Sequence, residues 1–217
     1  MISKIKYFIV NKLPFFSNIL QFVYSIFRQQ MSKVYIKRML KIKKEIFLEI
    51  GSGEKRGING WATIDVVNKC DIFWDLRKGI PFPENSVAKV YSSHLFEHLS
   101  FSEGQNLLSN CMRVLKPGGY FSICVPNAKL YIKAYLSQDS LDESFFRYKP
   151  ALNHTTKIDY VNYMAYMDGH HKYMFDKENL IYLLKSAGFS TVRSREFDPN
   201  LDLEERDFES IYAEAIK

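Results

Sequence analysis

Two glycines and an acid follow the first two short apolar runs of the chain's second part. Gly51 and Gly53 come directly after the run at 45–50, and Asp65 ends the run at 61–65. A glycine turn lets the backbone approach a ligand closely and leaves N–H groups free to bind it. An acid at the end of the next strand can accept hydrogen bonds from both hydroxyls of a ribose. The pattern therefore predicts a site for a molecule that contains a ribose.

The same stretch lacks what a dinucleotide site needs. Such a site uses a third glycine and an acid about 20 residues further on, whereas position 56 is Arg and Asp65 comes 14 residues after Gly51. The connection between the two strands also leaves room for little more than one helical turn. We expect a stunted first helix and a ligand without a pyrophosphate.

Histidines supply the candidates for proton transfer at neutral pH. His94 and His98 lie four residues apart after the fourth predicted strand, so on a helix they would share one face. A surface or packing role stays open for His98. Adjacent His170 and His171 point in opposite directions on an extended chain, so at most one should enter a site, and we favour His171. The fifth histidine is His154.

A metal site built from Asp168, His170 and His171 is conceivable, but these neighbouring residues do not show a defined ligand spacing. The three cysteines, Cys70, Cys111 and Cys124, form neither a C-x-x-C pair nor an even framework of disulfides. We therefore predict no metal and a reducing, cytoplasmic compartment.

Alternating apolar and helical patterns after Lys44 predict an α/β domain at 45–217 with a parallel sheet and crossover helices. The predicted strands are 45–50, 61–65, 70–74, 87–92, 119–125, 190–197 and 210–216. The predicted helices are 95–98, 102–115, 127–137 and 176–187, the last with Asp176 as N-cap and Gly188 at its C-terminal end. The stretch 137–168 is too long for a plain connection, so we interpret it as an insertion or lid on the substrate side.

These motifs resemble those of the class I S-adenosylmethionine-dependent methyltransferases, from Glu45 to the C-terminus. Glu49-Ile-Gly51-Ser52-Gly53 is similar to the family's first motif, while "IPFPENSVAKVYSSHLFEHL", "RVLKPGGYFSICVPN", "HHKYMFDKENLIYLLKSAGF" and "SIYAEAIK" are similar to later blocks. The resemblance implies a Rossmann-like seven-stranded sheet and S-adenosylmethionine as cofactor. It implies a cofactor site at Glu49, Gly51, Ser52, Gly53, Asp65, Val66, Asp75, Leu76, Ser92 and Ser93, with His94 and His171 as candidate catalytic residues.

Within that site, Asp65 would bind the ribose. Asp75 could accept a hydrogen bond from the adenine amino group, with Leu76 against the ring, although a turn-forming role for Asp75 is the alternative. The sequence Tyr91-Ser-Ser-His94 replaces the Asn/Asp-Pro-Pro-aromatic loop of enzymes that methylate exocyclic amines of nucleic-acid bases. We therefore expect O-methylation of a small acceptor, as in enzymes of bacterial polysaccharide biosynthesis.

The first 44 residues form a separate basic extension. They hold ten of the chain's 30 Lys and Arg and no acid, together with many apolar residues. Lys12, Pro14, Asn18 and Gln21 interrupt any span long enough to cross a membrane, and helical spacing begins after Ser17, the expected N-cap. The extension could be an amphipathic helix on the inner face of an anionic membrane, or a helix packed over the domain with solvated lysines.

Two rival functions stay open at this stage. One is a catalytically inactive, membrane-associated binding or scaffold protein with a methyltransferase fold, which the missing third glycine and the short first connection would suit. The other is an RNA ribose methyltransferase whose basic extension contacts phosphates. Nucleic acid is not expected as a partner, because no aromatic and basic channel for a single strand is evident.

Overall fold

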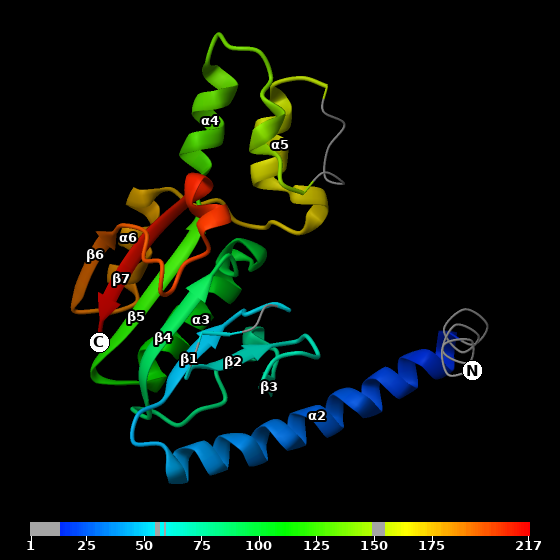
Figure 1. The fold of residues 1–217 in the computed structure, drawn as a ribbon, viewed down its shortest axis with the longest axis vertical. Helices are drawn as coiled ribbons and strands as arrows, with labels where there is room; N and C mark the ends of the chain where they lie inside the picture. Colours follow the sequence, from blue (N-terminus) through cyan, green and yellow to red (C-terminus); the bar gives the residue numbers. More distant parts are fainter. Residues whose placement is uncertain (1–13, 55–56, 59, 149–154) are drawn as a thin grey trace.

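The computed structural model describes residues 14–54, 57–58, 60–148 and 155–217, with side chains described from residue 19 onward. Its centre is a seven-stranded sheet in the order β3-β2-β1-β4-β5-β7-β6, in which only β7 runs antiparallel to its neighbours (Figure 1). The strands are β1 (Phe47–Ile50), β2 (Ala62–Asp65), β3 (Ile72–Phe73), β4 (Val87–Ser93), β5 (Leu115–Pro126), β6 (Thr191–Arg195) and β7 (Ser210–Ile216). The order reverses between β1 and β4, so ligands are expected at the carboxyl ends of these two strands. The predicted Rossmann-like methyltransferase sheet is confirmed.

Helices surround the sheet and stand at its two ends. They are α2 (Pro14–Ile42), α3 (Phe101–Val114), α4 (Ala128–Leu136), α5 (Ile158–Ala165) and α6 (Lys177–Ser186), with 3-10 turns η1 (Leu76–Lys78), η2 (Phe96–His98), η3 (Glu143–Phe145), η5 (Met167–Gly169) and η6 (Glu204–Glu209). Asp176 is the N-cap of α6, as predicted, whereas Ser17, the expected N-cap of α2, lies inside that helix, and the cap of α3 was not predicted. Ser100 and Glu103 form a capping box on α3, and Asp176 caps α6 by accepting from Asn179 N at 2.8 Å.

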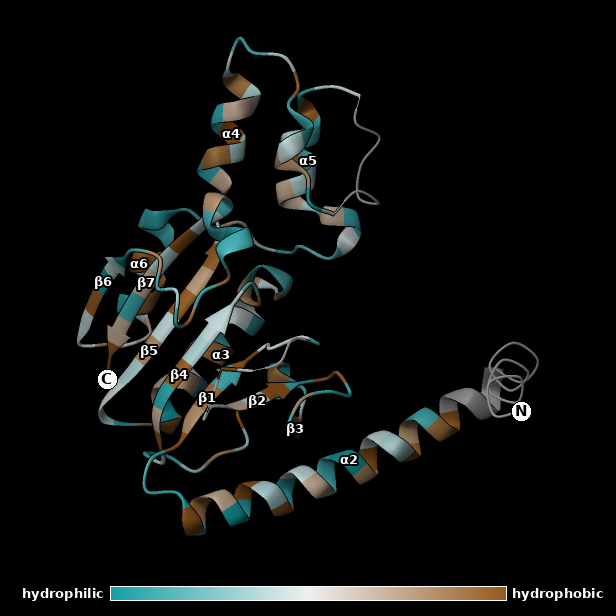
Figure 2. Ribbon diagram, viewed as in Figure 1, coloured by the Kyte–Doolittle hydropathy of each residue, from teal (hydrophilic) through white to brown (hydrophobic). Residues whose placement is uncertain are grey.

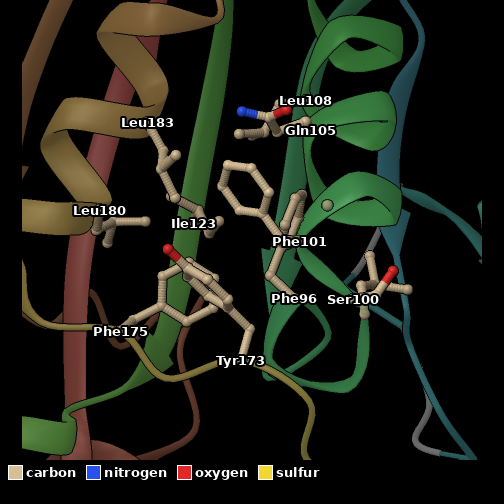
Figure 3. A pocket seen from close by; sticks show the side chains of 12 residues that line it. Phe96, Ser100, Phe101, Gln105, Leu108, Ile123, Tyr173, Phe175, Leu180 and Leu183 are labelled. Atoms are coloured by element: carbon tan, nitrogen blue, oxygen red, sulfur yellow. The ribbon is translucent and has the colours of Figure 1, made fainter.

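Helices α3 and α6 cover one face of the sheet and enclose a small apolar gap over β5 (Figure 3). Aromatic side chains from the segment before α6, among them Tyr173 and Phe175, turn toward Phe96 and Phe101 there. The gap measures only ≈20 Å³, which is close to the space of a single water molecule. It is therefore a packing feature of the core rather than a ligand site.

Three predicted boundaries are corrected. Strand β5 begins at Leu115, directly after α3, because Gly118 at φ +74° and a register shift between Val87 and Lys89 let the Lys116–Gly119 stretch continue into the sheet as a bulge. The expected helix at 95–98 is the 3-10 turn η2. Helix α2 begins at Pro14 instead of after Ser17, as suits a proline in a first helical turn.

The connection between β1 and β2 holds turns and no helix among its described residues, 51–54, 57–58 and 60–61. This connection packs closely against β2 at Gly57, where a Cβ would lie 2.3 Å from the Thr63 side chain. The expected stunted first helix is thus reduced further, to a turn.

The described residues of the insertion, 137–148 and 155–168, form a cap together with helix α4 at the carboxyl end of the central strands (Figure 1). The cap has its own buried cluster, rich in tyrosine and phenylalanine, made of Ala128, Tyr131, Phe146, Tyr160, Tyr163 and Met164. It is tied to the sheet by hydrogen bonds near Glu209, which accepts from Tyr131 Oη through its carboxylate at 2.5 Å and from Asn127 N at 2.7 Å. The lid expected from sequence length is therefore a small aromatic unit of its own.

Helix α2 docks along the β3 edge through its C-terminal half and extends beyond the sheet (Figure 1). Ile36 and Met39 are buried in the main core, and Ser32 Oγ accepts a hydrogen bond from Phe73 N at 2.8 Å. The outer part is unpartnered in the described structure: apolar residues such as Phe22 and Phe27 are 66% and 60% exposed. Figure 2 shows brown and teal segments alternating along this helix. Among the described helices, none combines the length and apolarity needed to span a bilayer.

Candidate active site

The glycine turn and Asp65 meet at the carboxyl edge of the sheet, as predicted. Asp65 Oδ2 accepts from Gly53 N at 2.8 Å, and its Oδ1 accepts from Val66 N at 2.6 Å. Gly51 and Gly53 both have positive φ values, +71° and +61°, which favour glycine. A Cβ on Gly51 would lie 2.7 Å from Leu95 Cβ, whereas one on Gly53 would meet nothing within 4 Å. Gly51 therefore serves packing, and Gly53 leaves open space beside the carboxylate.

A cavity of ≈310 Å³ begins at this carboxylate. It is lined by Asp65, Val66, Trp74, Asp75, Leu76, Arg77, Leu95, His98, Leu99 and Lys172. Two carboxylates thus face a largely apolar slot of the size that small ligands occupy. A nucleoside fits this donor and acceptor set: its hydroxyls can donate to Asp65, and its base can lie against Leu76 and Val66.

Asp75 differs from the expectation in one respect. Arg77 holds both of its oxygens, with Nε to Oδ1 and Nη2 to Oδ2 each at 2.9 Å. These hydrogen bonds lower the pKa of Asp75 and keep it ionised. Oδ1 also accepts from Arg77 N at 3.1 Å, so it is Oδ2 that keeps a lone pair for an adenine amino group, and the role assigned to Asp75 stays a prediction. Arg77 was not anticipated from the sequence.

Four predicted cofactor residues lie behind the cavity rather than on its lining. Ser52, Ser92 and Ser93 are buried, and Glu49 is buried with its Oε2 accepting from Ile58 N at 3.2 Å. Glu49 therefore ties the first connection back to β1. Their contacts with a cofactor stay predictions.

A second cavity, of ≈380 Å³, adjoins the first at His98. It lies between the sheet edge, the cap and η6, and is lined by His94, Glu97, His98, Pro126, Arg147, Tyr148, Tyr163, Met167, His171, Glu205, Arg206 and Glu209. Carboxylates, guanidinium groups, imidazoles and phenols make up most of this lining. Both predicted catalytic histidines, His94 and His171, lie on it.

His94 has no free lone pair with which to act as a base. Ser210 Oγ donates to Arg206 O at 2.6 Å, so it must accept from His94 Nε2 at 2.9 Å. The other nitrogen, Nδ1, faces the Glu97 carboxylate at 3.4 Å. Burial alone would lower the pKa of His94, but its contacts with Cys124 and Glu97 outweigh burial and raise the pKa to about 9. These contacts favour the protonated ring of His94 beside Glu97, and the catalytic role expected for His94 stays a prediction.

His171 has the opposite character. It is buried, and its Nδ1 lies 2.8 Å from Met164 O. Because a carbonyl oxygen can only accept, Nδ1 carries the proton and Nε2 keeps its lone pair. Burial lowers the pKa of His171 and favours the neutral ring. Of the two predicted catalytic histidines, His171 is the one able to accept a proton or a ligand.

Glu97 is the site residue that the sequence analysis missed. It is 2% exposed, and the charge and hydrogen bond of His94 outweigh its burial and lower the pKa of Glu97. The only sequence signal was its position three residues after His94, on the same turn. His170 contributes its backbone oxygen to His98 Nδ1, at 2.9 Å, while its ring packs against Tyr148. His154 lies outside the described residues.

Comparison with known proteins gives the same class of domain. A family model described as a methyltransferase domain matches residues 74–123, from Trp74 before η1 into β5. No curated protein matches the chain. An S-adenosylmethionine-dependent methyltransferase from Mesorhizobium loti superposes with a TM-score of 0.50 at 16% identity, over 79% of this chain and 90% of that one.

Two other methyltransferase structures are similar over most of the chain. One from Thermotoga maritima has a TM-score of 0.49 at 13% identity, covering 92% of this chain and 96% of its own. One from Archaeoglobus fulgidus has a TM-score of 0.48 at 19% identity, covering 89% of this chain and 99% of its own. The chain has the class I methyltransferase fold, and the matched domain supports S-adenosylmethionine-dependent methyl transfer with S-adenosylmethionine as cofactor.

Proposed function

We propose that this protein transfers the methyl group of S-adenosylmethionine to a hydroxyl of a sugar or glycan intermediate. The observation that carries the proposal is the ≈380 Å³ cavity that adjoins the cofactor cavity at His98. Its carboxylates and guanidinium groups can bind several hydroxyls at once, and Tyr148 and Tyr163 offer flat apolar faces for a sugar ring. An aromatic amine or a long apolar acceptor would leave most of these polar groups unpaired, which is costly.

The chain's own residues would align the reaction rather than supply its reactive group. Bound S-adenosylmethionine supplies the methyl group, and alignment of nucleophile and methyl carbon is the main task of such a site. Asp65 would hold the ribose at one end. We assign the contact with the acceptor hydroxyl to His171 Nε2, because His94 donates through both of its nitrogens.

Transfer of a labelled methyl group from S-adenosylmethionine to sugar and glycan precursors tests this function. We expect label in a product that is stable to conditions that cleave methyl esters. Binding of S-adenosylhomocysteine without any transfer would instead support the inactive scaffold. Transfer to RNA that collapses with added salt would support the ribose methyltransferase.

We also propose that α2 places the enzyme on the inner face of an anionic membrane. Its N-terminal half exposes apolar side chains, including Phe22 and Phe27, and its C-terminal half exposes Lys33, Lys37 and Lys41. Lysines near anionic headgroups contribute about 1 kcal/mol each, and apolar residues on the same helix can enter the interface.

Sedimentation with vesicles tests this contact. The full chain should sediment with anionic vesicles but not with neutral ones, and Phe22→Ser with Phe27→Ser should abolish the effect. Tyr182→Ser is the matched control, because Tyr182 is 66% exposed on α6, away from α2. Equal sedimentation of the double variant and the control would refute the membrane contact.

A further inference from the structure

Three side chains that can bind metal converge in the second cavity, beside His98, which also lines the first. Within the described part of the chain, one donor atom from each of Glu97, His98 and His171 lies within 4.8 Å of the others. Glu97 and His98 come from the η2 turn, and His171 comes from the segment after η5. The rings of His98 and His171 pack edge to face, with their centroids 5.2 Å apart.

The backbone orients both imidazoles in the way that metal-binding histidines are oriented. His98 Nδ1 lies 2.9 Å from His170 O, and His171 Nδ1 lies 2.8 Å from Met164 O. Since a carbonyl can only accept, each Nδ1 carries a proton, and in the neutral ring Nε2 then carries the lone pair. A histidine that ligates a metal through one nitrogen almost always donates its other N–H to a carbonyl or carboxylate. Both rings therefore already have the required tautomer.

The carboxylate of Glu97 supplies an independent indication of a ligand. Its Oε1 is shared by His94 Nδ1 at 3.4 Å and His98 Nε2 at 3.8 Å. Its Oε2 is fully enclosed and has no hydrogen-bond partner among the described residues, in a side chain that is 2% exposed. A buried oxygen of a charged group that has no hydrogen-bond partner destabilises the folded state. A cation bound at this oxygen would remove that destabilisation.

We propose that Glu97, His98 and His171 bind a divalent transition-metal ion of the zinc type. Two imidazole nitrogens and one carboxylate oxygen suit Zn²⁺, whereas Mg²⁺ and Ca²⁺ prefer an all-oxygen set. Bond lengths of about 2.0–2.2 Å would bring the donor atoms to roughly 3.3–3.5 Å from one another. The His98 side chain is 37% exposed, so a shift of this ring can provide the closure of up to about 1.5 Å that this geometry requires.

Three protein ligands leave an open coordination position, as in catalytic zinc sites. In this chain that position faces the polar cavity, because all three ligands line it. The ion would bind a hydroxyl oxygen of the acceptor there, and His171 would then hold the ion instead of contacting the hydroxyl itself. This part rests on the proposed function, whereas the binding of the ion does not.

Titration of the chelator-treated full-length protein tests the site. Zn²⁺ should bind in calorimetry with about one ion per chain, and Co²⁺ should give the visible absorption of a site of low coordination number. His98→Ala and Glu97→Gln should each weaken Zn²⁺ binding by about 100-fold or more, since even the loss of an outer-shell partner costs 10- to 100-fold. His170→Ala is the matched control, because only the backbone oxygen of His170 takes part.

Circular dichroism and melting of each variant show whether it is folded before its affinity is compared. The proposal is overturned if the folded wild type binds no Zn²⁺ or Co²⁺, if His98→Ala and His170→Ala bind equally, or if Mg²⁺ alone binds. S-adenosylhomocysteine binding and methyl transfer are measured on the same preparations. Ion binding without transfer would refute the proposed function and leave the metal site intact, while transfer without ion binding would do the reverse.

Discussion

Asp65 offers a direct test of how this site holds its cofactor. Its carboxylate accepts from two backbone N–H groups, Gly53 N at 2.8 Å and Val66 N at 2.6 Å, and lines the cofactor cavity. Both oxygens are thus fixed with lone pairs left for two ribose hydroxyls. In Asp65→Asn one oxygen becomes an NH₂ group, which can no longer accept from either side.

The expected loss follows from that count. One of the two ribose hydroxyls loses a charged acceptor, and a hydrogen bond to a charged group contributes about 1.5–3 kcal/mol. At 1.4 kcal/mol for each factor of ten, the Kd for S-adenosylhomocysteine should rise by about 10- to 150-fold. The new NH₂ group also faces the N–H of Gly53 or Val66, and two donors cannot form a hydrogen bond. The loss of affinity for S-adenosylhomocysteine should therefore not be smaller than this range.

Calorimetric titration with S-adenosylhomocysteine measures the effect. Asp71→Asn is the matched control: like Asp65, Asp71 accepts from a backbone N–H, since its Oδ2 accepts from Thr63 N at 3.0 Å and from Thr63 Oγ1 at 3.1 Å, but it does not line the cavity. We expect this control to bind as the wild type does. Wild-type affinity in Asp65→Asn would refute the ribose contact, and an equal loss in both variants would show that the effect comes from β2 rather than from the ligand.

Two predictions concern stability and are measured by thermal melting. Gly104→Ala in α3 places a Cβ 3.9 Å from Phe96, an ordinary contact, so the gain of about 0.5–1 kcal/mol in helix propensity should raise Tm by a few degrees; a lower Tm would show that α3 has no room there. Asp202→Asn leaves the buried Arg195 guanidinium, bonded to Asp202 at 2.5 and 2.7 Å, without its counterion. This substitution should lower the free energy of unfolding by about 3–5 kcal/mol and lower Tm by roughly 6–20 °C. A Tm within two degrees of the wild type would contradict the prediction.

The strands are the part of the fold that could be predicted well, because runs such as those of β1 and β4 are short, largely buried and end at clear turns. The start of β5 was missed for a specific reason. Lys116-Pro-Gly-Gly119 has the composition of a chain break, and only the pairing with β4 and the positive φ of Gly118 allow a bulge there. A tertiary partner decided the structure of that segment.

The candidate site likewise has features that the sequence could predict and features that depend on tertiary contacts. Asp65 and Gly53 could be brought together from local spacing, since both follow neighbouring parallel strands. The hydrogen bond that places a proton on His94 Nε2 goes to Ser210, 116 residues further along the chain, and no local pattern contains that information. Glu97 resembles any solvent-facing glutamate in a helical pattern, and its burial becomes evident only when the cap and η6 enclose it.

The separate aromatic core of the cap has a consequence for how such an enzyme can diverge. Among the described residues, the cluster around Tyr131, Tyr160 and Tyr163 shares no member with the main core. Cavity-forming substitutions cost stability mainly where they are made, so repacking the cap leaves the sheet and the cofactor turn intact. A lineage can therefore reshape the wall of the acceptor cavity that Arg147, Tyr148 and Tyr163 provide, and acquire new acceptors, while methyl-donor binding is inherited unchanged.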